Sequence, residues 1–204
     1  MRKIGVIFGG MSTEHEVSIS SGTSIISNLD KQKYEILPIY ISKSGEWYKY
    51  TKPVNDIIPL HVGDEITELE KIENEFECLK SLDIAFPVLH GLYGEDGTIQ
   101  GLLELLKIKY VGCKVLSSSI CMDKVYAKIV FDKAQIPQAD YAYVKAEKGK
   151  YTYVHKNFDE ETLDLDQICK KIESKLGLPV FVKPSNSGSS VGIKKAENIE
   201  ELKQ

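Results

Sequence analysis

A lysine at the end of an apolar run, followed by a loop of small polar residues, is the sequence feature that most directly suggests chemistry. The segment is VFVKPSNSGSSVGI, residues 180–193, in which Lys183 precedes a serine- and glycine-rich loop that extends to Ser190. The ammonium group, hydroxyl groups and backbone N–H groups of such a loop can hold a polyphosphate. The segment is not a Walker loop, which requires GxxxxGK[ST] between a strand and a helix. The structural alternative is a solvated hairpin.

Two other loops place polar side chains directly after apolar runs. Residues 9–18, GGMSTEHEVS, follow the first such run, and His90 follows a later one. Ligands of parallel α/β sheets bind at the carboxyl ends of the strands, so both loops are candidate binding positions. The glycine spacing does not match GxGxxG and no acid ends the second predicted strand, which argues against a dinucleotide site. The simpler alternatives are stabilisation of a helix dipole by Glu14 and Glu16 and a structural role for His90.

The elements that would position these loops alternate between strands and helices in the first part of the chain. This alternation predicts βαβ units and a mostly parallel sheet. Residues 65–82 have the polarity of a surface helix or an insertion. The predicted strands cover residues 3–8, 34–42, 46–50, 83–89 and 109–115, and helices are predicted over 17–29 and after residue 97.

A second unit is predicted to begin at Leu116, where the hydroxyls of Ser117, Ser118 and Ser119 suit a helix N-cap. The chain is expected to stop in the middle of this unit, because a helix capped by Asn198 has barely begun at the last residue. Helices are predicted over residues 120–134 and 167–176, and strands over 141–145, 151–155, 180–183 and 191–194, with a polar excursion over 148–165.

Composition is that of an ordinary globular protein and excludes several classes of function. The 204 residues are 42% hydrophobic and 27% charged, which corresponds to about 1.4 domains of average size. Because 26 Lys and Arg are outnumbered by 30 Asp and Glu, we expect no nucleic-acid partner. Apolar stretches such as 84–89 are far too short to span a membrane, and no signal-peptide core follows the N-terminus, so a cytoplasmic location is expected. The four cysteines are scattered, which argues against a zinc site or a disulfide framework.

Four motifs taken together resemble the D-alanine–D-alanine ligases, a family of ATP-grasp enzymes. They are GGMSTEHEVSISSG at 9–22, FPVLHGLYGEDGTIQGLLELL at 86–106, YVGCKVLSSSICMDK at 110–124 and FVKPSNSGSSVGI at 181–193. Their order over nearly the whole chain makes the resemblance more specific than any single loop. It implies an α/β fold with a parallel-sheet pre-ATP-grasp substrate domain over 1–115. The beginning of an ATP-grasp fold, its central α+β subdomain, would follow over 116–204, without the C-terminal part.

The resemblance implies ATP-dependent ligation of two D-alanines for peptidoglycan precursor synthesis. In the family reaction, ATP phosphorylates the carboxylate of the first D-alanine, and the amine of the second attacks the acyl phosphate. By motif, Glu14 would hold the ammonium of the first D-alanine, Val17 and His90 would be further substrate contacts, and Ser189 would link the carboxylate to a closing lid. Glu14 and Ser189 are therefore the expected catalytic residues.

The same resemblance implies that Lys124 and Lys183 neutralise the phosphates of ATP. The loop residues that would close over these phosphates are Ser187, Gly188, Ser189 and Ser190. The family's Mg²⁺ ligands would lie in the missing C-terminal part, so no metal ligand is expected within the chain and turnover by the 204 residues alone is not expected.

Two alternatives remain open from the sequence. The chain could be a truncated, non-catalytic protein that binds a D-amino acid or a nucleotide. The segment Ser44–Tyr48, SGEWY, also resembles relatives that make D-alanyl-D-serine, which leaves the acceptor open. The expected partners are D-alanine and ATP, with no membrane partner. The family commonly forms homodimers, but nothing in the sequence identifies an interface.

Overall fold

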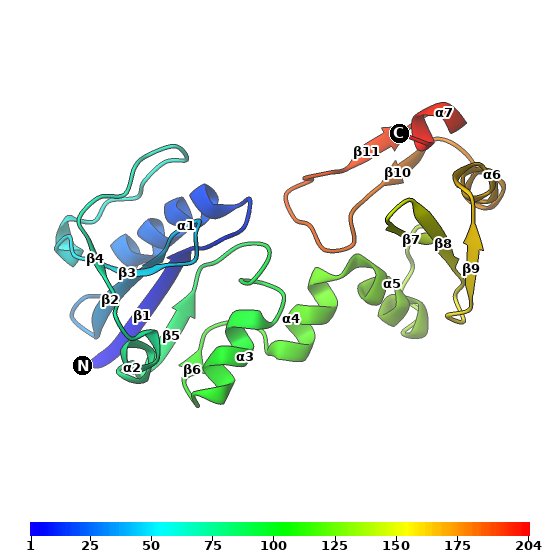
Figure 1. The fold of residues 1–204 in the computed structure, drawn as a ribbon. Coiled ribbons are helices and arrows are strands. Elements are labelled where there is room, and N and C mark those ends of the chain that lie inside the picture. Colours follow the sequence, from blue (N-terminus) through cyan, green and yellow to red (C-terminus); the bar gives the residue numbers. More distant parts are fainter. The chain divides into compact units, whose positions relative to one another are not determined.

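The computed structural model describes all residues from Met1 to Gln204, which form two compact units, Met1–Met122 and Asp123–Gln204 (Figure 1). The predicted α/β class is confirmed, because the first unit contains a sheet with parallel strands and flanking helices. The domain boundary after residue 115 remains a prediction; by its contacts, the helix that follows belongs to the first unit. None of the helices has the length and apolar character needed to cross a membrane.

The first unit is built on a six-stranded sheet of order β4-β3-β2-β1-β5-β6. The four strands β2, β1, β5 and β6 are parallel, whereas β3 and β4 extend the β2 edge as an antiparallel pair. The carboxyl ends of β1 and β5 therefore lie next to each other at one edge of the sheet. The strands are β1 Arg2–Gly9, β2 Tyr34–Ile41, β3 Trp47–Tyr50, β4 Leu69–Lys71, β5 Ile84–Pro87 and β6 Lys109–Tyr110.

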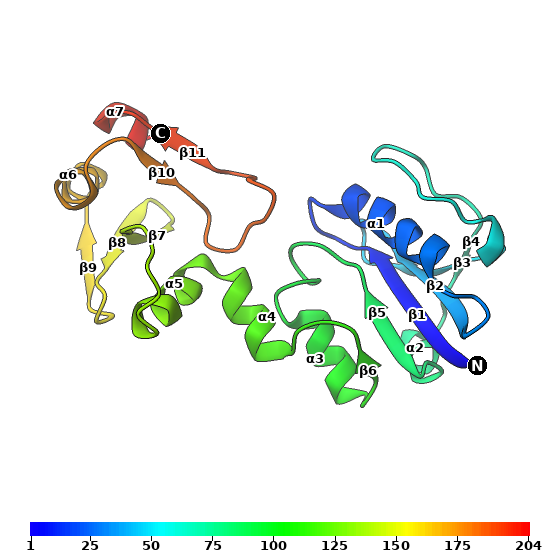
Figure 2. The ribbon, with the colours of Figure 1, turned by 180° about the vertical axis from the view of Figure 1, so that it is seen from behind.

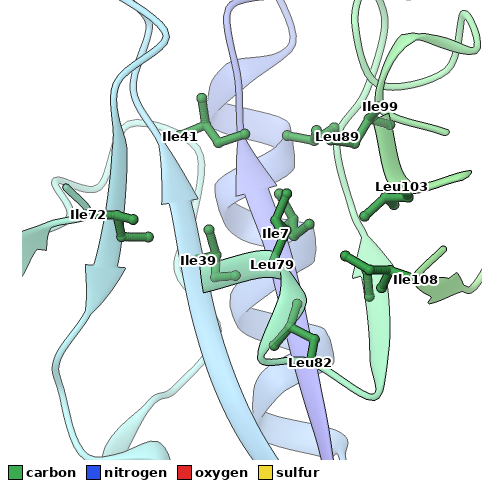
Figure 3. Packing of buried hydrophobic residues seen from close by; sticks show 11 residues of the cluster. Ile7, Ile39, Ile41, Ile72, Leu79, Leu82, Leu89, Ile99, Leu103 and Ile108 are labelled. Atoms are coloured by element: carbon green, nitrogen blue, oxygen red, sulfur yellow. The ribbon is translucent and has the colours of Figure 1, made fainter. Parts of the chain in front are cut away.

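Helices cover both faces of this sheet, because its central strands are apolar on both sides. On β1, Val6 and Phe8 pack toward α1, whereas Ile7 packs in the cluster on the opposite face. Figure 3 shows this second cluster on the side of the sheet turned away from α1. Figure 2 shows the ribbon from the side opposite to that of Figure 1. The helices of this unit are α1 His15–Asn28, α2 Glu75–Lys80, α3 Thr98–Leu105 and α4 Val115–Met122, with a 3₁₀ turn at Val54–Asp56.

Close packing of α1 on β1 depends on Gly22. A Cβ at this position would lie 2.4 Å from the Cβ of Phe8, which is fully buried. The helix can therefore approach the strand only without a side chain here. This close approach fixes the start of α1, and with it the loop that joins β1 to α1.

The second unit contains a three-stranded antiparallel sheet of order β7-β8-β9 and a separate two-stranded sheet, β10-β11. The first turn of α6 is closed by a capping box in which Asp164 and Gln167 exchange hydrogen bonds. The Asn198 cap predicted from the sequence is confirmed, because its side chain accepts a hydrogen bond from Glu201 N. The elements are α5 Lys124–Lys133, β7 Tyr143–Glu147, β8 Lys150–Val154, β9 Glu160–Leu163, α6 Leu165–Leu176, β10 Val180–Val182, β11 Lys194–Ala196 and α7 Ile199–Leu202.

The predicted continuous helix over 120–134 is wrong, and so is the serine N-cap before it. The serines lie inside α4, and the chain breaks at Asp123, whose carboxylate accepts hydrogen bonds from Val125 N and Tyr126 N. Asp123 therefore caps α5, which begins at Lys124, whereas the preceding serines already lie in helical positions of α4.

Two strand predictions also differ from the structure, and the strands β4 and β9 were not predicted. The strand predicted over 109–115 ends at Tyr110, shortly before Gly112 with a φ of 129°. The strand β9 was not predicted, because its polar residues Glu160 and Glu161 gave no apolar pattern; they pair with lysines instead. The return strand begins at Lys194 rather than Val191, since residues 188–193 are used in turns.

Candidate functional site

The loop between β1 and α1 is held against the end of β2. Gly9 has a φ of +89°, and a Cβ there would lie 2.2 Å from the carbonyl oxygen of Ile41. The next residue, Gly10, donates its N–H to the same carbonyl at 2.8 Å. Glycine is thus required where the chain turns away from the sheet.

His15 connects the same loop to β2 through hydrogen bonds of its ring. Its buried ring places Nδ1 2.5 Å from Gly10 O and Nε2 3.2 Å from the Tyr40 hydroxyl. A carbonyl only accepts, so Nδ1 donates to it, and in the neutral ring Nε2 accepts from Tyr40. The pKa of Tyr40 is raised mainly by burial and to a smaller extent by the nearby Tyr48, so this hydroxyl keeps its proton. His15 is therefore a structural histidine.

Glu14 stands at the N-cap of α1, but its side chain makes no capping hydrogen bond. The carboxylate instead lies against the loop that follows β5: a Cβ on Gly91 would come within 2.6 Å of Glu14 Oε2. Val17 lies one helical turn further along α1 with 43% of its surface exposed. Glu16 forms an ion pair with Lys43 at 3.1 Å, so the two acids of this loop have different surroundings.

His90 lies on the loop after β5 and is half-buried. Its Nε2 is 3.1 Å from Ser21 Oγ on α1, and its carbonyl oxygen accepts a hydrogen bond from Ser12 Oγ at 2.7 Å. The first unit thus brings together the loops that carry Glu14 and His90, as the shared strand ends predict. A carboxylate can bind a cationic group and an imidazole N–H can donate to an anionic one, so the two loops together carry groups for both.

In the second unit, the start of α5 is tied to the serine-rich loop. Lys124 N donates to Ser185 O at 3.0 Å, and Lys124 Nζ donates to Ser187 O at 2.5 Å. The lysine predicted to bind phosphate therefore lies directly beside residues 187–190. The half-buried Lys124 side chain is held in place by the loop's own backbone.

The loop between β10 and β11 has an irregular and specific backbone. Lys183 follows β10 and is exposed, and it forms no ion pair within the chain. Ser189 and Ser190 both have positive φ, 47° and 61°, and Ile193 N donates to Ser190 O. The segment from residue 183 to 190 carries an ammonium group, hydroxyls and backbone N–H groups but no carboxylate, a donor set that fits a phosphate chain such as that of ATP.

Comparisons with known proteins give matches in both units of the chain. Residues 3–113 match the family model of the D-ala D-ala ligase N-terminus, and residues 130–204 match that of the D-ala D-ala ligase C-terminus. The chain belongs to the D-alanine–D-alanine ligase family. It is 50% identical over 204 residues to the D-alanine–D-alanine ligase of Clostridium acetobutylicum, and the match covers 98% of this chain and 55% of the relative.

Solved ligases of the family have the same fold. The D-Ala:D-Ser ligase VanG from Enterococcus faecalis matches with a TM-score of 0.74 and 36% identity, covering 98% of this chain and 57% of that one. The Bacillus anthracis D-alanine–D-alanine ligase complexed with ATP matches with a TM-score of 0.65 and 35% identity, covering 99% and 52%. The chain spans about half the length of the curated relatives it matches.

Resemblance to the D-alanine–D-alanine ligases did not identify the serines that hold the two loops of the first unit together. Ser18 is fully buried; its Oγ accepts from Gly9 N at 2.8 Å and donates to Val88 O at 2.6 Å. A signal was present, since Ser18 and Gly22 are spaced four residues apart on a helix face that would otherwise be apolar. No group of three or more His, Cys, Asp or Glu that could hold a metal ion occurs in the structure.

Proposed function

We propose that this chain carries the first-substrate site and the ATP-phosphate site of an ATP-dependent ligase that joins two D-alanines to D-alanyl-D-alanine, a peptidoglycan precursor. The observation that carries the proposal is its identity of 48% and 50% to two D-alanine–D-alanine ligases over 98% of its length. The two-domain organisation at 1–115 and 116–204, a cytoplasmic location and a homodimer belong to the same proposal.

In the first unit, Glu14 would bind the ammonium of the first D-alanine through a charge-assisted hydrogen bond. This contact selects an amino acid over a simple carboxylic acid. Val17 would be a further contact of this substrate, and His90 would lie near its carboxyl group. The position of the Glu14 carboxylate against Gly91, on the loop that carries His90, supports this assignment.

In the second unit, Lys124 and Lys183 would neutralise the phosphates of ATP. Residues 187–190 would close over them with hydroxyl and N–H donors, and Ser189 would help to join the substrate carboxylate region to this closure. Phosphoryl transfer requires mainly positioning and charge stabilisation, which these groups can provide. The relative from Bacillus anthracis that was solved with ATP supports the choice of nucleotide.

Magnesium is proposed as the metal of the complete reaction, where it would stabilise charge on the transferred phosphoryl group. Residues 1–204 do not fit a Mg²⁺ site, because they contain no cluster of metal-ligating side chains. We therefore assign no metal ligand in this chain and derive no step through the ion.

The proposal is tested by D-alanine-dependent release of phosphate from ATP. The complete product of the gene and the 204-residue chain are assayed side by side, with Glu14→Gln as the variant that keeps the side-chain shape but removes the charge. We expect release by the complete product and loss of at least about tenfold in kcat/KM for D-alanine in Glu14→Gln. Absence of D-alanine-dependent release from the complete product would refute the function. Calorimetric titration of the 204-residue chain with D-alanine and ATP tests whether it binds either ligand without turnover.

A D-alanine–D-serine ligase is the second candidate, favoured by the match to VanG and by the SGEWY segment at residues 44–48. In the structure this segment forms the turn between β2 and β3 and the beginning of β3. Competition between D-alanine, D-serine and D-lactate as acceptors separates the two candidates. Preference for D-alanine supports the first, and preference for D-serine supports the second.

A further inference from the structure

We propose that Ser12 is a positioning residue for the first D-alanine, acting through the two loops that carry Glu14 and His90. This inference rests on the proposed function and adds a residue that the motifs did not assign. The two loops leave the carboxyl ends of neighbouring parallel strands, β1 and β5. Side chains on separate loops can bind one small molecule only if the spacing of the loops is fixed.

The Ser12 hydroxyl makes the direct connection between the two loops. It donates to the carbonyl oxygen of His90 at 2.7 Å and accepts from the backbone N–H of Glu14 at 3.1 Å. A hydroxyl can donate and accept at once, which neither a methyl group nor an ammonium can do. The Ser12 Oγ atom thus fixes the distance between the backbone of Glu14, which is expected to bind the ammonium group, and the backbone of His90, which is expected to lie near the carboxyl group.

The surroundings show that this connection is separate from the one that holds the fold together. Ser18 links Gly9 to Val88 from a fully buried position, close to the sheet. Ser12 is only half-buried and lies further along the loop. Water can therefore replace its hydroxyl in a variant, so removal should leave the unit folded while the two loops lose their fixed spacing.

The close surroundings of Gly91 leave little room for a change in the spacing of the two loops. A Cβ at this residue would lie 2.6 Å from Glu14 Oε2 and 3.4 Å from both Cβ and Oγ of Ser12. The Glu14 carboxylate and the Ser12 side chain therefore both lie close to the backbone at Gly91. A small shift of one loop changes where the carboxylate points, and misplacement by about 1 Å can reduce a rate by about 10²-fold.

The experiment compares three variants of the complete gene product. Ser12→Ala removes the hydroxyl, and Ser12→Thr keeps it. Ser27→Ala is the matched control, because the half-buried Ser27 hydroxyl also donates to a carbonyl, Ser24 O, and accepts from an amide, Asn28 Nδ2, at the far end of α1. Initial rates are measured over wide ranges of D-alanine and ATP, with separate constants for the first and second D-alanine, and thermal unfolding is followed for each protein.

We expect Ser12→Ala to raise KM for the first D-alanine about tenfold, with KM for ATP changed less than about twofold. Ser12→Thr should recover most of the loss, Ser27→Ala should behave as the unchanged protein, and the two alanine variants should unfold at similar temperatures. An unchanged KM for the first D-alanine in Ser12→Ala overturns the proposal. Equal damage in Ser12→Thr also overturns it, as does a joint rise of both KM values with a lowered unfolding temperature.

Failure of the proposed function has a different signature. In that case the unchanged protein shows no D-alanine-dependent phosphate release, and the positioning proposal falls with the function. If the unchanged protein is active and Ser12→Ala matches Ser27→Ala, only the positioning proposal is overturned.

Discussion

Substitution of Gly91 by alanine separates damage to the substrate site from damage to the fold. Gly91 has a φ of +69°, a left-handed conformation that costs an alanine about 1–2 kcal/mol. The added Cβ would also come within 2.6 Å of Glu14 Oε2. Because that oxygen is the end of a flexible side chain, the contact is relieved by moving the carboxylate rather than the backbone.

The expected effect on the substrate follows from that movement. A charge-assisted hydrogen bond contributes about 1.5–3 kcal/mol, so displacing the carboxylate from the ammonium should raise KM for the first D-alanine about 10- to 150-fold. The free energy of unfolding should fall by only about 1–2 kcal/mol, since nothing in the core is displaced. The two effects are measured in different assays, so damage to the substrate site and damage to the fold are determined separately.

Gly63→Ala is the matched control, because Gly63 has a φ of +96° and nothing within 4 Å of its added Cβ. Both variants carry a backbone penalty, but only Gly91→Ala disturbs Glu14. Urea unfolding gives the stability change, and D-alanine-dependent phosphate release by the complete gene product gives KM. Equal KM values for the two variants would show that the Glu14 carboxylate does not need its place beside Gly91, and the reasoning would be refuted.

Three other predictions test different parts of the chain. Lys183→Ala should raise KM for ATP about tenfold or more and leave KM for D-alanine nearly unchanged, as measured by initial rates. Gly22→Ala should destabilise the protein by about 1–3 kcal/mol in urea unfolding, because its Cβ would lie 2.4 Å from the fully buried Phe8. Burial favours the neutral form of Asp96, but hydrogen bonds from the backbone N–H groups of Tyr93 and Thr98 outweigh it and lower its pKa. Its stabilising contribution should be present above about pH 4 and lost as the pH falls through the lowered pKa, and Asp96→Asn should remove this dependence in urea titrations.

The sequence predicted the central strands β1 and β2 well because they are largely buried on both faces. Continuous apolar runs such as 3–8 and 34–42 leave little choice of element, and β1 and β2 lie at those positions. The polar strand β9 was missed because Glu160 and Glu161 give no apolar pattern; the strand is held by backbone pairing with β8. The break before α5 is not predicted, because Asp123 lies within the helix predicted over 120–134 and only the structure shows its carboxylate capping α5.

For the site, residue type suggests a chemistry but does not show what holds each residue in place. A glutamate after β1 and lysines beside a serine loop are candidates from the sequence alone because their charges can bind an ammonium group and phosphates. Ser12 and Ser18 were not recognisable, since a serine in a loop or helix is common and only the structure shows which carbonyl it reaches. The importance of Gly91 becomes evident only from the structure, in which the Glu14 carboxylate lies next to it.

The two proposed sites place different geometric requirements on the chain. The ammonium and carboxyl groups of one amino acid are separated by a single carbon, so the groups that bind them would have to be closely fixed. In the first unit, hydrogen bonds through Ser12 and the buried Ser18 hold the two candidate loops together. A triphosphate is long and flexible and is attracted by lysines largely as point charges. For the proposed phosphate site, an exposed loop with one anchored lysine, Lys124, and one exposed lysine, Lys183, would be sufficient. Loss of an anchor in the first unit should therefore appear as weaker D-alanine binding, whereas changes in the serine loop should appear as weaker ATP binding.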